Sequence, residues 1–347
     1  MSLVERHTAL GAVLANDGIP LHYADQRREY AAALNSAVLM ERSHEGRLLL
    51  TGRDRLAIMH RISTNDLESI PVGSGRPTIF TNATARVLDR ATVYVLPADR
   101  VFVLTEPGRG DALRGYLQRN VFFNDELKLA SLATERRQFV VHGPTADQVI
   151  AAAFPAAADL PVLGLVELDD LLVARDKPLT GSHWRVFPAA EQAEAVWDHL
   201  LTAGAAFGLL PAGSLTYNVL RIGAARPGVG RELTTDYIPL ELGLWDEVSF
   251  KKGCYTGQEI IARMESRGRI AKTIVALELE AAVTAPCPLL HEGREVGTLT
   301  SSVTEPLNGQ HLGIGVVKLA QAEVDQVFTA HGVSARVTRL PGVQPPL

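Results

Sequence analysis

The chain of 347 residues contains only two cysteines, and it lacks the short motifs by which many catalytic and metal sites are recognised. No two cysteines are spaced as CxxC, no HExxH occurs, and the ten histidines show no ligand spacing. There is no GxxxxGK[ST] phosphate loop, no GxSxG nucleophile turn, and no GxGxxG after an expected strand. These absences argue against a metal hydrolase, a kinase and a nicotinamide dehydrogenase.

Long apolar runs are also missing. The most apolar stretch, residues 149–160, contains Pro155 and Asp159 and is too short to span a bilayer. Glu5 and Arg6 stand where the apolar part of a signal peptide would begin. Together with two cysteines that have no paired spacing, this predicts a cytoplasmic protein without membrane association.

The composition is that of an ordinary soluble globular protein, with 46% hydrophobic and 21% charged residues. The length predicts two or three domains. A net charge of -5 argues against general nucleic-acid binding and leaves only a local basic patch for such a role.

Helical and strand patterns alternate through the first 200 residues. Asp25 is expected to cap a helix that ends near Asn35, and Asp111 to cap another. Residues 193–201 show the clearest helical spacing, which places Trp197 in the core. Further elements are expected as a helix at 54–62 and strands at 78–82, 86–96, 101–105, 127–132, 137–142, 166–174 and 183–188. The mixture predicts an α+β fold, with helices on one face of a mostly antiparallel sheet.

From Lys272 onward the pattern changes to short alternating strands with glycine turns. A hairpin is expected around Glu292 and Gly293. About 75 residues of this kind predict a small C-terminal β-barrel as a separate domain. Cys287, between two prolines, is expected to be structural.

The segment VSFKKGCYTGQEIIARMESRGRI, residues 248–270, carries the most chemistry. Its pattern predicts a strand over 248–252, a glycine-flanked turn with Cys254, and a helix. Thr256 and Glu259 have the spacing of a capping box at the start of that helix.

The surroundings of Cys254 favour a reactive thiol. A helix N-terminus and the adjacent Lys251 and Lys252 would each lower the pKa of a thiol. Strand alternation would point Lys252 inward. The alternative is a small core thiol behind a solvated lysine pair, since free cysteine is often buried.

The eight residues KGCYTGQE, 252–259, resemble the signature of the YgfZ family, which comprises folate-binding iron–sulfur maintenance proteins related to the glycine-cleavage aminomethyltransferase. The stretches LLLTGRDRLAIMHRISTNDLESI, RIGAARPGVGRELTTDYIPLELGL and GTLTSSV are similar to further blocks of that family. The resemblance implies an α+β, three-subdomain, aminomethyltransferase-like ring with a C-terminal antiparallel β-barrel. The implied domains are 1–50 with 140–270, which bind folate, an inserted ferredoxin-like part at 51–139, and the barrel at 271–347.

The same resemblance implies tetrahydrofolate as cofactor and iron–sulfur proteins or their assembly factors as partners. The missing ligand spacing predicts no metal site. Cys254 would be the functional thiol. Arg221, Arg263 and Lys252 would meet carboxylates of the folate. Either arginine could instead form a structural ion pair, such as Arg263 with Glu259. The full set of implied cofactor contacts is Lys252, Tyr255, Gln258, Glu259, Arg221 and Arg263.

Two departures separate this chain from the aminomethyltransferases. Those enzymes carry an Asp-Asp pair where this chain has Asp89 and Arg90, and a pterin-binding Glu where it has Gly223. Both changes remove acid groups, which favours an accessory protein for iron–sulfur assembly or repair, with an indirect effect on tRNA modification. The alternatives are a folate-dependent aminomethyltransferase or demethylase, and direct tRNA binding through the basic residues Arg263, Arg267, Arg269 and Lys272.

Overall fold

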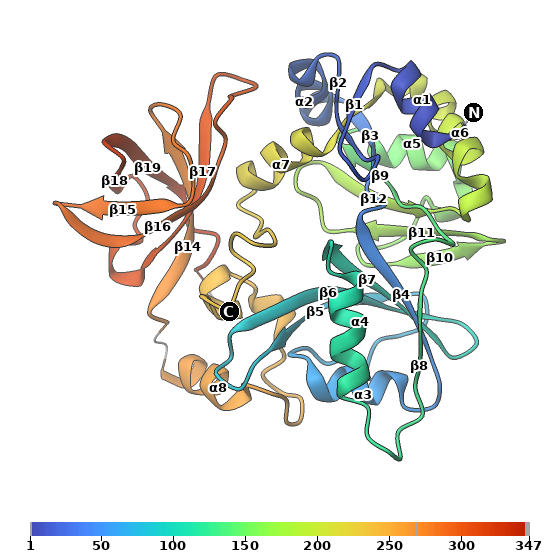
Figure 1. The fold of residues 1–347 in the computed structure, drawn as a ribbon, viewed down its shortest axis with the longest axis horizontal. Coiled ribbons are helices and arrows are strands. Elements are labelled where there is room, and N and C mark those ends of the chain that lie inside the picture. The colour runs from blue at the N-terminus through green and yellow to red at the C-terminus, as the bar shows by residue number, and fades with distance from the viewer. Residues whose placement is uncertain (1, 268–269, 344–347) are drawn as a thin grey trace. The chain divides into compact units, whose positions relative to one another are not determined.

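The computed structural model of the chain describes residues 2–267 and 270–343. The chain, drawn as a ribbon in Figure 1, divides into two compact units. Each unit has its own hydrophobic core. The first comprises Met1–Arg55, Ile70–Arg76 and Thr92–Leu220, and the second comprises Leu56–Ser69, Pro77–Ala91 and Arg221–Leu347.

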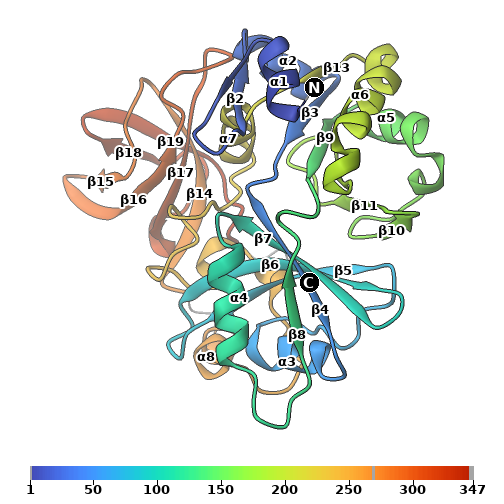
Figure 2. The same ribbon diagram turned by 45° about the vertical axis from the view of Figure 1, so that its right-hand side comes forward.

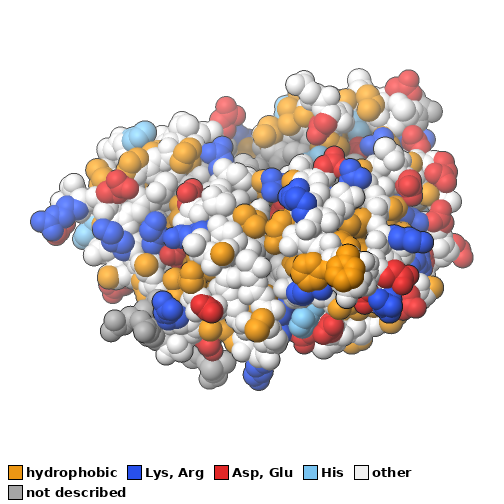
Figure 3. Space-filling view, turned by 60° about the horizontal axis from the view of Figure 1, so that its bottom comes forward, with side chains coloured by type: hydrophobic (Ala, Val, Ile, Leu, Met, Phe, Trp, Pro, Cys, Tyr) orange, Lys and Arg blue, Asp and Glu red, His pale blue; other side chains and the backbone are white. Residues whose placement is uncertain are grey.

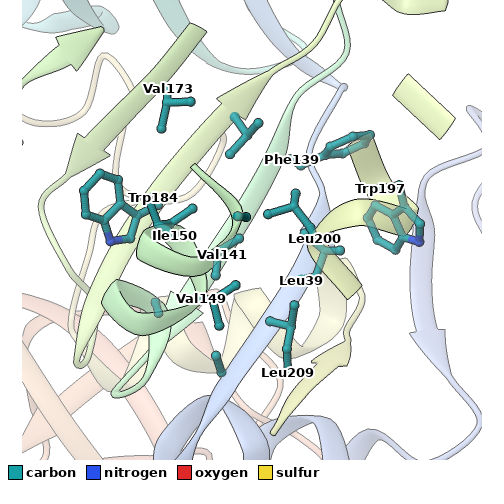
Figure 4. Packing of buried hydrophobic residues seen from close by; sticks show 14 of the residues in the cluster. Leu39, Phe139, Val141, Val149, Ile150, Val173, Trp184, Trp197, Leu200 and Leu209 are labelled. Carbon is teal, nitrogen blue, oxygen red and sulfur yellow. The ribbon is translucent and has the colours of Figure 1, made fainter. Parts of the chain in front are cut away.

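A six-stranded sheet forms the centre of the first unit. Its strands pair in the order β10-β11-β12-β9-β3-β13, all antiparallel except β13 with β3. Helices α5 and α6 pack against it through a cluster that includes Trp184 and Trp197, both fully buried (Figure 4). Trp197 lies in the core as predicted, where truncation of such a side chain to alanine costs about 3–5 kcal/mol. The elements are β3 (Ala37–Glu41), β9 (Phe139–Gly143), α5 (Ala146–Ala153), β10 (Leu165–Leu168), β11 (Leu171–Asp176), β12 (Ser182–Phe187), α6 (Ala193–Gly204) and β13 (Leu209–Pro211).

The N-terminal part of this unit contains α1 (Leu3–Ala9), a two-stranded sheet of β1 (Ala12–Leu14) and β2 (Pro20–Tyr23), and α2 (Gln26–Asn35). The Asp25 carboxylate accepts from the amides of Arg27 and Arg28, which confirms the predicted cap.

A five-stranded sheet has the order β5-β6-β7-β4-β8. Figure 2 shows α4 lying along this sheet, where it contacts β4, β7 and β8. The helix begins at Gly110 and Asp111 lies within its first turn, so the cap predicted at Asp111 is wrong. The carboxylate of Asp111 instead interacts favourably with the positive N-terminal end of the helix dipole. The elements are β4 (Glu45–Thr51), α3 (Arg55–Ile62), β5 (Gly75–Thr81), β6 (Val87–Leu96), β7 (Arg100–Pro107), α4 (Gly110–Arg119) and β8 (Lys128–Ser131).

The second unit contains α8 (Gln258–Arg267) and a closed antiparallel barrel in the order β14-β17-β16-β15-β18-β19. Glu292 and Gly293 both have positive φ, as a tight hairpin turn requires. The predicted α+β class and C-terminal barrel are therefore confirmed. The barrel strands are β14 (Lys272–Leu279), β15 (Cys287–His291), β16 (Arg294–Ser302), β17 (His311–Lys318), β18 (Val327–Ala330) and β19 (Val333–Arg339).

The remaining helical elements are α7 (Ser214–Gly223) and the short 3₁₀ turns Pro155–Ala157, Ala190–Gln192, Ala205–Phe207, Pro239–Leu242, Trp245–Glu247 and Leu319–Gln321. The three-part domain boundaries inferred above stay a prediction. Within the described ranges, no helix combines the length and the apolar character needed to cross a bilayer.

Candidate functional site

The segment before α8 is irregular, so the strand predicted over 248–252 is wrong. Its backbone is held by scattered contacts in place of a strand ladder. The amide of Ser249 donates to the carbonyl of Thr64 (3.0 Å), and the Thr64 hydroxyl donates to the carbonyl of Glu247 (2.7 Å). The side-chain amide of Asn65 donates to the carbonyl of Asp246 (3.1 Å). Residues 64–65 therefore bind residues 246–249 along their length.

Lys252 points inward, as the alternation pattern indicated, but it contacts backbone. Its Nζ donates to the carbonyls of His60, Ser63 (2.7 Å) and Asn65 (3.1 Å), at the C-terminal end of α3. An ammonium has three hydrogens, so these three acceptors satisfy it completely. A cation at this position is favoured by the unpaired carbonyls and the negative end of the helix dipole.

The environment of Lys252 alters its titration. Burial lowers the pKa of Lys252 to about 8, although the carboxylates of Asp66 and Glu68 act in the opposite direction. The pKa of His60 is also lowered, first by burial and then by the positive charge of Lys252. Lys252 lies 5.0 Å from the centre of the Tyr255 ring, and burial raises the pKa of that phenol to about 12.

A second set of contacts holds the chain just after the cysteine. The Thr81 hydroxyl donates to the carbonyl of Thr256 (2.5 Å). Gly257 has a φ of +85°, and a Cβ there would lie 2.8 Å from Ala85 Cα, so only glycine fits. The amide of Ile261 donates to the carbonyl of Gly257 (3.4 Å), which makes Gly257, one residue later than predicted, the residue that precedes the helix.

Cys254 is exposed, whereas Cys287 is buried in the barrel. The neighbouring Gly253 has open space where a side chain would project. Lys251 is exposed, and Lys252 turns its ammonium toward α3. Cys254 therefore lies in a turn before the helix, as predicted, and its exposure contradicts the alternative of a core thiol.

Arg90, which stands where the resemblance implies an acid, is almost buried on β6. Its Nε and Nη2 donate to the two carboxylate oxygens of Glu247 at 2.7 and 2.5 Å. The backbone amide of Arg90 donates to the carboxylate of Asp89 (3.0 Å). Sequence reasoning noted the lost acid but missed Glu247, 157 positions away. The signal in the sequence is an arginine in the middle of an expected strand, since a buried arginine needs a carboxylate partner.

Arg221 lies in a network centred on the fully buried carboxylate of Glu232. One oxygen of Glu232 accepts from the hydroxyls of Thr300 (2.5 Å) and Ser301 (2.7 Å), and the other from the amide of Gly228 (2.9 Å). Arg221 lies 3.3 Å from this carboxylate and donates to the Ser301 hydroxyl (3.1 Å). The ion-pair alternative for Arg221 is therefore present in the structure.

The position of the expected pterin-binding acid, Gly223, offers no carboxylate. Its carbonyl accepts from Arg339, and a Cβ there would lie 3.4 Å from Leu312 Cδ1.

The remaining predicted contacts lie on or beside α8. Gln258 donates weakly to the carbonyl of Lys252 (3.5 Å), and Glu259 is exposed. Arg263 is also exposed, and among the described residues no ion pair joins it to Glu259. Tyr255 is buried. The structure therefore places Lys252, Tyr255 and Gln258 around the cysteine turn, and Arg221 in a separate network.

The basic run considered for tRNA is only partly described, because Arg269 lies outside the described residues. On the face seen in Figure 3, Lys and Arg side chains lie interspersed with Asp and Glu. Within the described part of the chain, no group of three or more His, Cys, Asp or Glu side chains is arranged to hold a metal ion.

Comparison with known proteins identifies one family model and several relatives that are named as transferases. The family model described as the GCVT N-terminal domain matches residues 3–252. A chloroplastic protein of Arabidopsis thaliana, provisionally named a transferase, is 26% identical over 95% of this chain and 77% of its own length. An aminomethyltransferase of Moorella thermoacetica is 27% identical over 98% of this chain and 96% of its own.

The fold has a solved counterpart in the glycine cleavage system aminomethyltransferase T from Bartonella henselae. The TM-score is 0.86 at 21% identity, covering 99% of this chain and 98% of that one. The predicted aminomethyltransferase-like fold is thereby confirmed. The family model matches well over half of the length of this chain. The chain therefore belongs to the GCVT N-terminal domain family.

Proposed function

We propose that this chain is a tetrahydrofolate-binding accessory protein that supports iron–sulfur cluster assembly or repair, with Cys254 as its functional thiol. It would act in the cytoplasm, and its effect on tRNA modification would be indirect, through iron–sulfur enzymes. The proposal goes beyond family membership, since the relatives above are named as transferases.

The observation that carries the proposal is the state of Arg90. The resemblance implies that one-carbon transfer needs a carboxylate at this place, beside the reacting folate nitrogen. A guanidinium stays protonated and cannot accept a proton. Because its Nε and Nη2 bind both oxygens of Glu247 in a nearly buried pair, it also cannot move aside without leaving a carboxylate unpaired. These features favour folate binding without aminomethyl transfer.

The described residues fit a folate in part. Arg263 offers an exposed guanidinium suited to the carboxylates of a glutamate tail. Arg221 would first have to release Glu232 and Ser301. Gly223 supplies no acceptor for the pterin edge. A grip on the tail is therefore better supported than a family-type grip on the pterin, and the contacts named from the sequence remain proposals.

Calorimetric titration of tetrahydrofolate under anaerobic conditions tests the cofactor. We expect saturable binding to the wild type and weaker binding to Arg263→Ala, with a larger loss for a polyglutamylated folate. The matched control is Arg294→Ala, which removes an exposed arginine from barrel strand β16 and should leave the affinity for folate unchanged. Absence of saturable binding to the wild type would refute the proposal that the chain binds tetrahydrofolate.

The accessory role is tested in host cells from which the gene is deleted. We expect lowered activity of a host iron–sulfur dehydratase, restored by the wild-type gene and not by Cys254→Ser. Full restoration by Cys254→Ser would refute the role of the thiol.

The second candidate is a folate-dependent aminomethyltransferase or demethylase, and the names of the relatives favour it. Asp89 is retained and nearly buried. This candidate predicts turnover of tetrahydrofolate with an aminomethyl-lipoyl carrier or an N-methyl substrate. Measurable turnover by the wild-type protein would favour it over the accessory role.

A further inference from the structure

The residues Gly253, Cys254 and Tyr255, here termed the Cys254 arch, lie between two anchored positions, Lys252 and Thr256. Gly253 and Cys254 are exposed, whereas Tyr255 is only 8% exposed. The arch therefore presents its sulfur outward while the residue after it is packed inward.

The first anchor is Lys252. It binds three carbonyls of residues 60–65, which lie 187 to 192 positions away in the sequence. Ser249 and Thr64 extend this attachment along the backbone. The charged or titratable groups that face Lys252 are His60, Asp66, Glu68 and Tyr255.

The second anchor is the hydroxyl of Thr81, which binds the carbonyl of Thr256 from 175 positions away. Gly257 then contacts the backbone of residues 82–85 too closely for any side chain. Both ends of the arch are therefore held by residues that are distant in the sequence.

We propose that Lys252 and Thr81 are positioning residues for the Cys254 thiol, which they hold outward on a fixed arch within reach of a macromolecular partner. The inference rests on the proposed role of Cys254. It gives Lys252 a positioning role, because all three ammonium hydrogens are directed at carbonyls of residues 60–65.

Hydrogen exchange of the amides of residues 253–257 tests the anchors on the purified full-length protein. We expect exchange to rise about tenfold or more in Lys252→Met, since three hydrogen bonds are lost, and by a smaller factor in Thr81→Val. The matched control is Lys251→Met, which removes the adjacent exposed lysine and should leave exchange unchanged.

The reaction rate of Cys254 with an aromatic disulfide reagent separates positioning from charge. A charge effect would weaken with added salt, would be shared by Lys251→Met and Lys252→Met, and would be restored in Lys252→Arg. Positioning predicts a change in Lys252→Met that resists salt and is not restored by arginine, whose planar fork cannot meet three converging carbonyls.

Equal effects of the two lysine variants, or unchanged exchange in Lys252→Met, would overturn the proposal. If Lys252→Met does not fold, Thr81→Val carries the same test from the other anchor. These measurements need no client protein, so failure of the anchors is distinguishable from failure of Cys254→Ser to behave as expected in cells.

Discussion

Two buried carboxylates in the second unit hold their arginines differently. Among the described residues, Arg90 is the side chain that binds Glu247, and it contacts both carboxylate oxygens, at 2.7 and 2.5 Å. Glu232 is bound by two hydroxyls and an amide, while Arg221 lies at 3.3 Å. Within the described part of the chain, the Glu247 carboxylate thus depends on its arginine, whereas Arg221 is one of four groups around the Glu232 carboxylate.

The difference shows which arginine is available for other work. Removing Arg90 would strand a buried charge, whereas Glu232 retains three neutral donors when Arg221 moves. Of the two, Arg221 is therefore the one that a ligand carboxylate could recruit, and Arg90 is committed to the fold.

The largest effect is expected for Arg90→Met. An unpaired Glu247 carboxylate should lower the free energy of unfolding by about 3–5 kcal/mol, measured by urea denaturation. The double variant Arg90→Met/Glu247→Leu should recover most of this loss, because an apolar pair replaces a buried ion pair at little cost. A loss below about 1 kcal/mol in the single variant would break the contrast between the two carboxylates.

A smaller effect is expected for Arg221→Met. Loss of one charged hydrogen-bond partner should lower the free energy of unfolding by about 1.5–3 kcal/mol, measured in the same way. If Arg221→Met lowered the free energy of unfolding as much as Arg90→Met, the hydroxyls of Thr300 and Ser301 would not stabilise the Glu232 carboxylate as inferred.

The pH dependence of stability tests the environment of Lys252, the first anchor of the Cys254 arch. The pKa of Lys252 is about 8 in the folded chain, below its ordinary value of 10.5. Between these values the unfolded chain binds more protons, so the contribution of Lys252 to stability rises with pH across that window. The stability of the wild type relative to Lys252→Met should therefore increase from pH 8 to pH 10, measured by denaturation. A flat difference would mean that Lys252 is not desolvated.

The smallest effect is expected for Cys254→Ser, which should change the free energy of unfolding by no more than about 0.5 kcal/mol because the side chain is exposed. Cys287→Ser should cost about 1–3 kcal/mol, since it places a hydroxyl in the barrel core. Comparable losses in both variants would show that the arch is packed rather than presented.

Local patterns were sufficient for much of the fold. The cap at Asp25, the helix around Trp197 and the turn at Glu292 and Gly293 all depend on residues close in sequence, and each was predictable. The position of Cys254 in a glycine-flanked turn before a helix was predictable for the same reason.

The supports of the candidate site were not predictable. Lys252 points inward, as expected. It does not lie on a strand, because the backbone around it is irregular and its side chain binds carbonyls of residues 60–65. Arg90 and Glu247 are 157 positions apart, and no periodicity connects them. Such contacts depend on the packing of segments that are far apart in the sequence, and local sequence patterns do not reveal that packing.

The contrast between the two cysteines has a practical consequence. With one thiol exposed and the other enclosed by barrel strands, a maleimide dye added to the native protein should attach at a single place. That place, Cys254, lies four residues before the first residue of α8. The natural chain is thus ready for single-site fluorescence or spin labelling without removal of any residue, and the label would report directly on whatever docks beside the arch.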